Sequence, residues 1–242
     1  MKKIYEKIIN KHILEIRHKP YMKFLDIKGE ISNFIIKLRR FNFTYWHISD
    51  NRLDFMDTSG KIKTFVSLTN FGIVIENAPS LNYFKDQSAL FLNNILEFPG
   101  FSDRDITRLG TRSFFLVDRK QTFNDIKRKY QDKFLDLNPK SMEIFNANLV
   151  DIGAPFYFEE NDKKSSFNTR SGPMKKDQMN SFFIDSKLYP NNIFPESALY
   201  FDIDYFTKDI GKKNDEDLLN IVKNNINRSI DIFIKFKDYV LE

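Results

Sequence analysis

The stretch ITRLGTRSFFLV, residues 106–117, has the alternation of a β-strand that is buried on one side only. The apolar side holds three residues, Leu109, Phe115 and Val117. The polar side holds Arg108, Gly110 and Arg112. A strand of this kind is typical of an antiparallel sheet with helices on one face and nothing on the other.

The stretch ALYFDIDYF, residues 198–206, alternates in the same way and places Asp202 and Asp204 on its polar side. Period two therefore predicts two aspartates and two arginines, Arg108 and Arg112, on one open sheet face. Opposite charges on neighbouring strands attract each other, so we expect these residues to pair across strands, with Arg112 opposite Asp204.

Four amphipathic helices accompany the strands, and each has a single apolar stripe. They are expected at residues 27–38, 80–98, 122–137 and 214–233. Thr122 is followed by Asp125 three residues later, which is close to a capping box, and Asn214 precedes acidic residues that suit a helix N-terminus.

The order of elements is the same in both halves of the chain. Residues 1–100 and 101–242 each read as strand, helix, three strands, helix. We predict an α+β fold: tandem β-α-β-β-β-α units, packed together as one globular body, forming a mostly antiparallel sheet with four helices on one face. The remaining strands are expected at 11–18, 43–48, 61–68, 71–76, 148–159 and 165–170. Residues 174–197 give no clear pattern, and Pro190 and Pro195 indicate a loop there.

Composition limits the class of protein. The 26 Phe and 10 Tyr among 242 residues predict an aromatic core. No run of about 18 apolar residues occurs, so we expect no membrane contact. The chain has no cysteine, which excludes disulfides and a cysteine nucleophile and fits a cytoplasmic location.

Basic residues gather around the first helix of each half. Residues 1–40 hold 11 Lys and Arg against 4 acidic residues, and residues 101–140 hold 10 against 6. Such asymmetry can attract phosphates, although solvated helix faces have the same composition.

Arg39 and Arg40 stand immediately before a run of aromatic residues, Phe41 to Trp46. Exposed aromatics beside arginines can stack on single-stranded bases. Burial in a central strand is the alternative that we expect. The apolar residues on both sides of this strand also suit a contact between two copies of the chain.

Motifs for catalysis or cofactor binding are missing from the sequence: there is no Gly-x-Ser-x-Gly, no Walker loop, no Gly-x-Gly-x-x-Gly and no His-x-x-x-His. We therefore expect no catalytic residue, no cofactor and no metal. Asp202 and Asp204, about 7 Å apart on one strand face, could share a divalent cation, but no further ligand can be placed beside them. Arg108 and Arg112 could clamp a phosphate or carboxylate, with Gly110 allowing close approach.

The segments RLGTR (108–112) and FDID (201–204), with Trp46-His47-Ile48-Ser49 upstream, resemble a sporadically distributed prokaryotic protein family of unassigned function. The strand Glu15-Ile16-Arg17 and the amphipathic C-terminal helix belong to the same similarity, which spans nearly the whole chain. The resemblance implies a small cytoplasmic bacterial or phage-related protein, brings no catalytic residue, and suits an accessory or defence gene.

Three hypotheses remain open. The first is a non-enzymatic accessory protein of a bacterial defence or regulatory system, which binds a protein partner. The second is an RNA-binding or RNA-processing protein that uses the basic first helices and the open sheet face. The third is a metal-dependent phosphodiesterase. The candidate binding residues are Arg108, Arg112, Asp202, Asp204, Arg39 and Arg40.

Overall fold

The computed structural model describes residues 7–99, 101, 104–134, 149–183 and 193–241. The strands of the first half are β1 (Lys7–His18), β2 (Phe43–Ile48), β3 (Arg52–Asp57), β4 (Ile62–Ser67) and β5 (Asn70–Glu76). Those of the second half are β6 (Ile106–Asp118), β7 (Ala154–Glu159), β8 (Ser165–Lys175) and β9 (Ser197–Gly211). The helices are α1 (Phe24–Ile36), α2 (Leu81–Leu96), α3 (Phe123–Phe134), α5 (Lys176–Phe182) and α6 (Asp215–Leu241).

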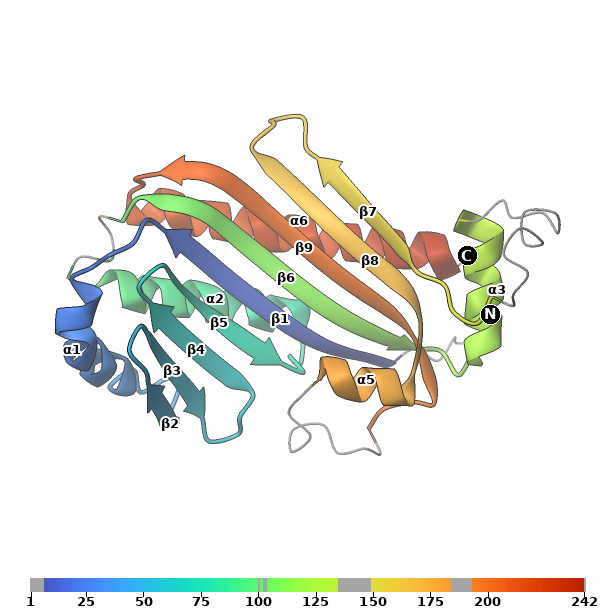
Figure 1. Cartoon of the computed structure of the whole chain (residues 1–242), viewed down its shortest axis with the longest axis horizontal. Helices are drawn as coiled ribbons and strands as arrows, with labels where there is room; N and C mark the ends of the chain where they lie inside the picture. Colours follow the sequence, from blue (N-terminus) through green and yellow to red (C-terminus); the bar gives the residue numbers. More distant parts are fainter. Residues whose placement is uncertain (1–6, 100, 102–103, 135–148, 184–192, 242) are drawn as a thin grey trace.

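The strands form one nine-stranded sheet in the order β2-β3-β4-β5-β1-β6-β9-β8-β7, and every neighbouring pair is antiparallel (Figure 1). The predicted α+β class and antiparallel sheet are therefore confirmed. The first strand of each half, β1 or β6, lies in the middle of the sheet. These two strands pair with each other, and each also pairs with the last strand of its own half.

The order of elements departs from the predicted one in both halves. The first half contains the additional strand β3, whose Leu53 and Phe55 are buried while charged residues alternate with them. The second half contains the additional helix α5, within the stretch where a loop was indicated. The predicted positions Leu137, Asn148 and Pro190 lie outside the described residues.

Strand β8 continues through Ser171-Gly172-Pro173, where the sequence predicted its end. Its pairing with β7 stops at Ser171, while its pairing with β9 continues to Lys175. Pro173 therefore lies where β8 has a neighbouring strand on one side only. Proline has no N–H to donate to a neighbouring strand. It is tolerated where a strand has a neighbour on one side only, because fewer hydrogen bonds between strands are needed there.

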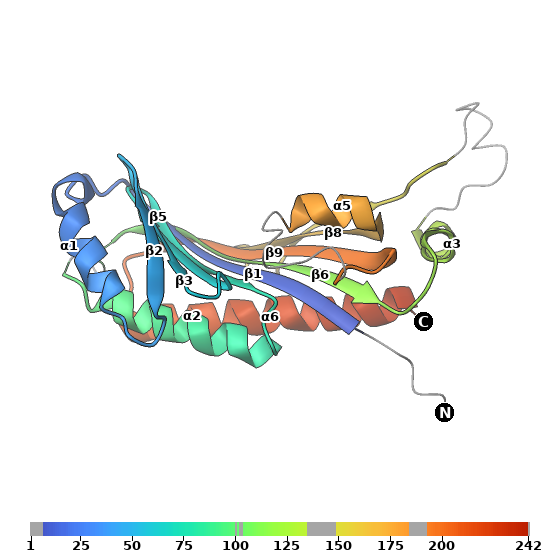
Figure 2. The same cartoon turned by 90° about the horizontal axis from the view of Figure 1, so that it is seen from below.

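The expected placement of four helices on one face is not confirmed. Figure 2 shows α2 and α6 on one face of the sheet, α5 on the opposite face, and α1 and α3 at the two ends. We call the side under α2 and α6 the helix-covered face and the opposite side the open face. Within the described ranges, no helix has the length and apolarity needed to cross a bilayer.

Aromatic packing fills the helix-covered face. Leu14 and Ile16 of β1 are fully buried there, and Phe115 of β6 stacks on Phe233 of α6 with ring centroids 3.7 Å apart. A smaller apolar cluster lies on the open face under α5, where Leu116 packs with Met179. The open face is therefore covered at one end and remains accessible over the middle of the sheet.

Candidate functional site

A single row of side chains crosses the open face from one edge of the sheet to the other. The strand registers align Tyr45, Met56, Lys63, Val74, Ile13, Arg112, Asp204, Asn168 and Tyr157. Residues opposite each other on antiparallel strands point to the same face, so the row is continuous. At ~4.8 Å between strands it is about 38 Å long. Its two end residues, Tyr45 and Tyr157, are 61% and 69% exposed.

Arg112 and Asp202 form a two-pronged ion pair in the middle of the open face. Nε and Nη2 of Arg112 donate to the two carboxylate oxygens of Asp202 at 2.8 and 2.7 Å. The Asp202 side chain is only 5% exposed, whereas that of Arg112 is 44% exposed. The hydrogen bonds to Asp202 raise the pKa of the Arg112 guanidinium. This geometry fixes the guanidinium while leaving part of it accessible to a ligand.

Arg108 bridges two carboxylates. Its Nη2 donates to both oxygens of Asp204 at 2.9 Å, and its Nη1 lies 3.4 Å from Oε2 of Glu15. The guanidinium also lies over the ring of Phe206, 4.4 Å from the centroid. Burial raises the pKa of Asp204 by more than the charge of Arg108 lowers it.

Gly110 provides the space that the Arg108 guanidinium occupies. A Cβ at this position would lie 2.5 Å from Nη1 of Arg108, closer than van der Waals contact allows. The sequence suggested that the glycine admits a ligand or another backbone. In the structure the neighbouring arginine takes this place.

The predicted pairing of arginines on β6 with aspartates on β9 is confirmed, but Arg112 was assigned to the wrong aspartate. Arg112 stands directly opposite Asp204 in the register, yet its ion pair is with Asp202. Arg108 takes Asp204 instead. Both arginines reach along β9 past the residue directly opposite. Arg112 reaches the aspartate two positions away, as a long side chain can. Arg108 stands opposite Lys208 and extends over Gly110 to the aspartate four positions away.

Arg39 and Arg40 lie apart from this cluster. Both are exposed, in the turn between α1 and β2 at the edge of the sheet. The predicted central strand is thus an edge strand, and the burial expected for its aromatic run is wrong for Tyr45 and Trp46. Burial is confirmed for Phe43, which is 6% exposed.

The basic residues of the first forty positions are not concentrated on the first helix. Helix α1 contains Lys28 together with Asp26 and Glu30. In α3, Lys127, Lys129 and Lys133 donate to main-chain carbonyls of Leu149, Leu241 and Tyr239.

The open face has two further arginines, Arg52 of β3 and Arg170 of β8, that sequence reasoning did not single out. Arg170 of β8 is exposed and stands opposite Asp202 in the register. The period-two rule applied to residues 165–170 could have found it, but only with the register of β8 against β9, which the sequence does not give.

Two histidines lie on the helix-covered face, away from this cluster. His12 is fully buried, stacks on Phe84 with centroids 4.6 Å apart, and hydrogen-bonds through Nδ1 to Ser113 Oγ at 2.8 Å. Burial lowers the pKa of His12 to about 3 and that of His18 to about 4. Both rings are therefore neutral near pH 7.

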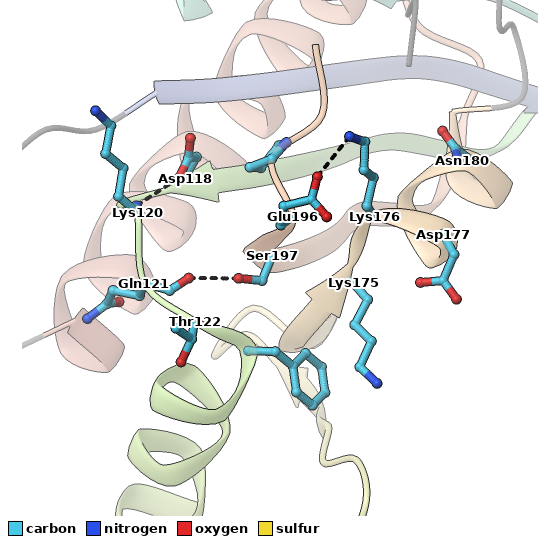
Figure 3. Close-up of a pocket in the computed structure, with 12 residues that line it drawn as sticks. Asp118, Lys120, Gln121, Thr122, Lys175, Lys176, Asp177, Asn180, Glu196 and Ser197 are labelled. Atoms are coloured by element: carbon cyan, nitrogen blue, oxygen red, sulfur yellow. Dashed lines mark hydrogen bonds and ion pairs between the residues drawn. The ribbon is translucent and has the colours of Figure 1, made fainter. Parts of the chain in front are cut away.

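Several hollows lie on the open-face side of the sheet. A small cavity of about 220 Å³ is lined by Glu15, Arg108, Arg112 and Asp204 among others. A larger cleft of about 930 Å³ lies between the end of β6 and the start of α5 (Figure 3). In that cleft Lys176 pairs with Glu196 at 2.9 Å. Among the residues that the structure describes, no group of three or more His, Asp and Glu side chains is placed to hold a metal ion.

Comparison with known proteins adds little to this picture. No family model and no curated protein matches the chain. Among solved structures, the chain is similar to a rolling circle replication initiator protein from Geobacillus stearothermophilus, at 9% identity and a TM-score of 0.27. That match covers 91% of this chain and 80% of the other. A score this low carries no argument about fold or function.

Proposed function

We propose that the protein is a non-enzymatic binding module whose open sheet face holds a protein partner. The observation that carries this proposal is the composition of that face. It combines exposed tyrosines, Tyr45 and Tyr157, with partly exposed arginines, Arg112 and Arg170. Tyr and Arg are enriched among the residues that dominate protein–protein binding energies.

The charges of the open face favour a protein over a nucleic acid. The guanidiniums of Arg108 and Arg112 are held by Asp204 and Asp202. A phosphate would have to displace a two-pronged carboxylate from either arginine. A protein surface that carries both signs can complement the face without breaking these pairs.

The length of the row fits a folded partner. A standard protein interface buries about 800 Å² on each side. A strip about 38 Å long would need a width of only about 21 Å to supply that area, roughly six residues along the strands.

The strand order supports an origin from two copies of one unit. In each half the first strand is central and pairs with the last strand of that half. We interpret the chain as a pseudo-symmetric tandem fold, in which β3 and α5 are additions to a shared β-α-β-β-β-α plan. From the family resemblance we further propose a cytoplasmic accessory component of a bacterial defence or regulatory system.

Capture from the native host tests the partner proposal. The tagged full chain is compared with Arg170→Glu, Tyr157→Ala and the matched control Lys223→Glu, which alters an exposed lysine on α6. We expect one protein to be retained in high salt by the wild type and the control, and to be lost with both open-face variants. Equal retention by all four chains would contradict the proposal.

The same experiment separates the RNA-binding alternative. RNA bound through phosphates would dissociate steeply as salt rises. It would also be lost in the double variant Arg39→Ala/Arg40→Ala and after nuclease treatment. That outcome, without a co-purifying protein, would replace the first proposal by the second.

A further inference from the structure

Strand β2 is an open edge of the sheet without any charged residue. Its sequence is FTYWHI, and among the strands that the structure describes it pairs with β3 alone. Residues 44–48 are all exposed, including Trp46 at 54% and Ile48 at 46%. Natural sheets usually protect such an edge with lysine, proline or a covering segment, because unpaired backbone groups recruit another strand.

The apolar side of this edge continues the helix-covered face. Trp46 stands opposite Phe55, and Ile48 stands opposite Leu53. Phe55 and Leu53 are 2% and 0% exposed. The buried layer of the sheet therefore extends to β2 and ends there in two exposed side chains.

The backbone of β2 is oriented for a further strand. The N–H of Ser49 donates to the carbonyl of Arg52 at 2.9 Å, which fixes the hydrogen-bonding phase of the β2–β3 pair. Hydrogen-bonded and non-hydrogen-bonded pairs alternate along an antiparallel ladder. The N–H and C=O groups of Trp46 and Ile48 consequently point away from β3, toward the free edge.

The two ends of β2 differ in charge. Arg39 and Arg40 lie just before the strand, and Asp50 lies just after it; all three are exposed. A second β2 added in the antiparallel direction places the basic end of one strand beside the acidic end of the other. The charge pattern therefore complements itself under a two-fold axis.

We propose that a second copy of this chain docks on β2 through its own β2, which makes one continuous antiparallel sheet across the dimer. The two-fold axis passes through Trp46, so that the two Trp46 side chains meet and Tyr45 of each copy faces His47 of the other. This contact uses the edge of β2, whereas the partner-binding proposal concerns the open face; Tyr45 lies where the two surfaces meet.

Sedimentation and tryptophan fluorescence of the full chain test this contact directly. Trp46 is the only tryptophan in the sequence, so its emission reports on this edge alone. As concentration rises, we expect a species of twice the 28.8 kDa chain mass together with a blue shift of the emission. A chain that stays monomeric, or a dimer without any emission shift, would overturn the proposal.

Charge placed on the edge provides the second test. Trp46→Lys sets two like charges against each other across the axis and should weaken dimerisation about tenfold or more. The matched control is Tyr157→Lys, which alters an exposed aromatic on the opposite edge strand, β7, and should leave the dimer unchanged. Dissociation by the control variant but not by Trp46→Lys would place the interface at β7 and reject this one.

Cysteine cross-linking tests the register without altering Trp46. The native chain has no cysteine, so Tyr45→Cys and His47→Cys each introduce a single thiol. In the proposed register these positions form a non-hydrogen-bonded pair with Cα atoms about 4.5 Å apart, within reach of a disulfide. A disulfide in the mixture, absent from either variant alone, is expected. Its absence under oxidising conditions would reject the register.

Discussion

The helix-covered face and the open face belong to the same nine strands but are stabilised by different contacts. On β6 the helix-covered face holds Leu109 and Phe115, both fully buried. The open face of the same strand holds Arg108 and Arg112, whose charges are matched by aspartates of β9. Apolar burial depends on area removed from water, whereas the ion pairs depend on which residue reaches which. One face therefore supplies stability, and the other supplies a defined arrangement of charges.

The largest difference between the two faces should appear when a ring is removed from each. Phe201 of β9 is fully buried, with its ring 5.5 Å from Phe233 and 5.3 Å from Phe236. Phe201→Ala should lower the free energy of unfolding by about 3–5 kcal/mol, because it removes apolar contacts and leaves a cavity. Tyr157→Ala on the open face should change it by less than about 0.5 kcal/mol. Urea denaturation measures both, and similar values would contradict the contrast.

Acid should lower the free energy of unfolding of the protein through the two buried histidines of the helix-covered face. The pKa is about 3 for His12 and about 4 for His18, against 6.5 for each in the unfolded chain. Below pH 6.5 both imidazoles become protonated in the unfolded chain, whereas in the folded chain they stay neutral down to about pH 4. The stability is therefore complete above pH 6.5 and falls as the pH drops toward these folded values.

Each histidine should contribute a slope that approaches about 1.4 kcal/mol per pH unit near pH 5, between its folded and unfolded pKa values. The variant His12→Phe should lose its share of this slope, whatever its stability at pH 7. Denaturation at a series of pH values measures the slope. An unchanged slope in the variant would show that His12 is not the group that titrates.

A double-mutant cycle tests the pairing on the open face. Arg112→Asp removes the two-pronged ion pair of the buried Asp202 carboxylate and puts a new negative charge beside it, which should cost about 1–3 kcal/mol. The exchange Arg112→Asp/Asp202→Arg should recover part of that loss. The control exchange Arg112→Asp/Asp204→Arg, which follows the register, should recover less. Equal recovery in both exchanges would mean that the diagonal pairing is not specific.

The smallest effect concerns two glycines. Gly110→Ala pushes a Cβ into the Arg108 guanidinium, a flexible group that can move, so we expect a cost of about 1 kcal/mol. Gly29→Ala in α1 meets nothing within 4 Å and should instead stabilise by about 0.5–1 kcal/mol through helix propensity. Thermal denaturation should therefore shift in opposite directions for the two variants. A shift in the same direction would contradict the close approach at Gly110.

The sequence predicted which residues share a face better than it predicted their neighbours. Period two placed Arg108, Arg112, Asp202 and Asp204 together because alternation along a strand is a local property. Their pairing depends on the reach of long side chains across strands, so Arg112 was assigned to the wrong aspartate. The capping hydroxyl of Thr122, which accepts from the N–H of Asp125, was also predicted from local spacing.

Features that depend on contacts between distant parts of the chain could not be predicted from the sequence. The edge position of β2 follows from the order of all nine strands, so the exposure of Trp46 could not be read from its own neighbours. The cover supplied by α5 depends on Met179 meeting Leu116 across more than sixty residues. Strand β3 was missed although Arg52 and Asp54 alternate with Leu53 and Phe55, because this short pattern lies between two turn-forming stretches, residues 49–51 and 57–60.

The seam between β1 and β6 has a consequence for synthesis of the protein. Lys7 pairs with Asp118, so one side of β1 must wait for more than a hundred further residues before it gains a neighbour. Its other side is satisfied sooner by β5, which ends at Glu76. During nearly half of its translation, the nascent chain therefore has a long β1 edge whose backbone N–H and C=O groups have no partner strand. Until β6 emerges from the ribosome, that edge can pair with a wrong strand.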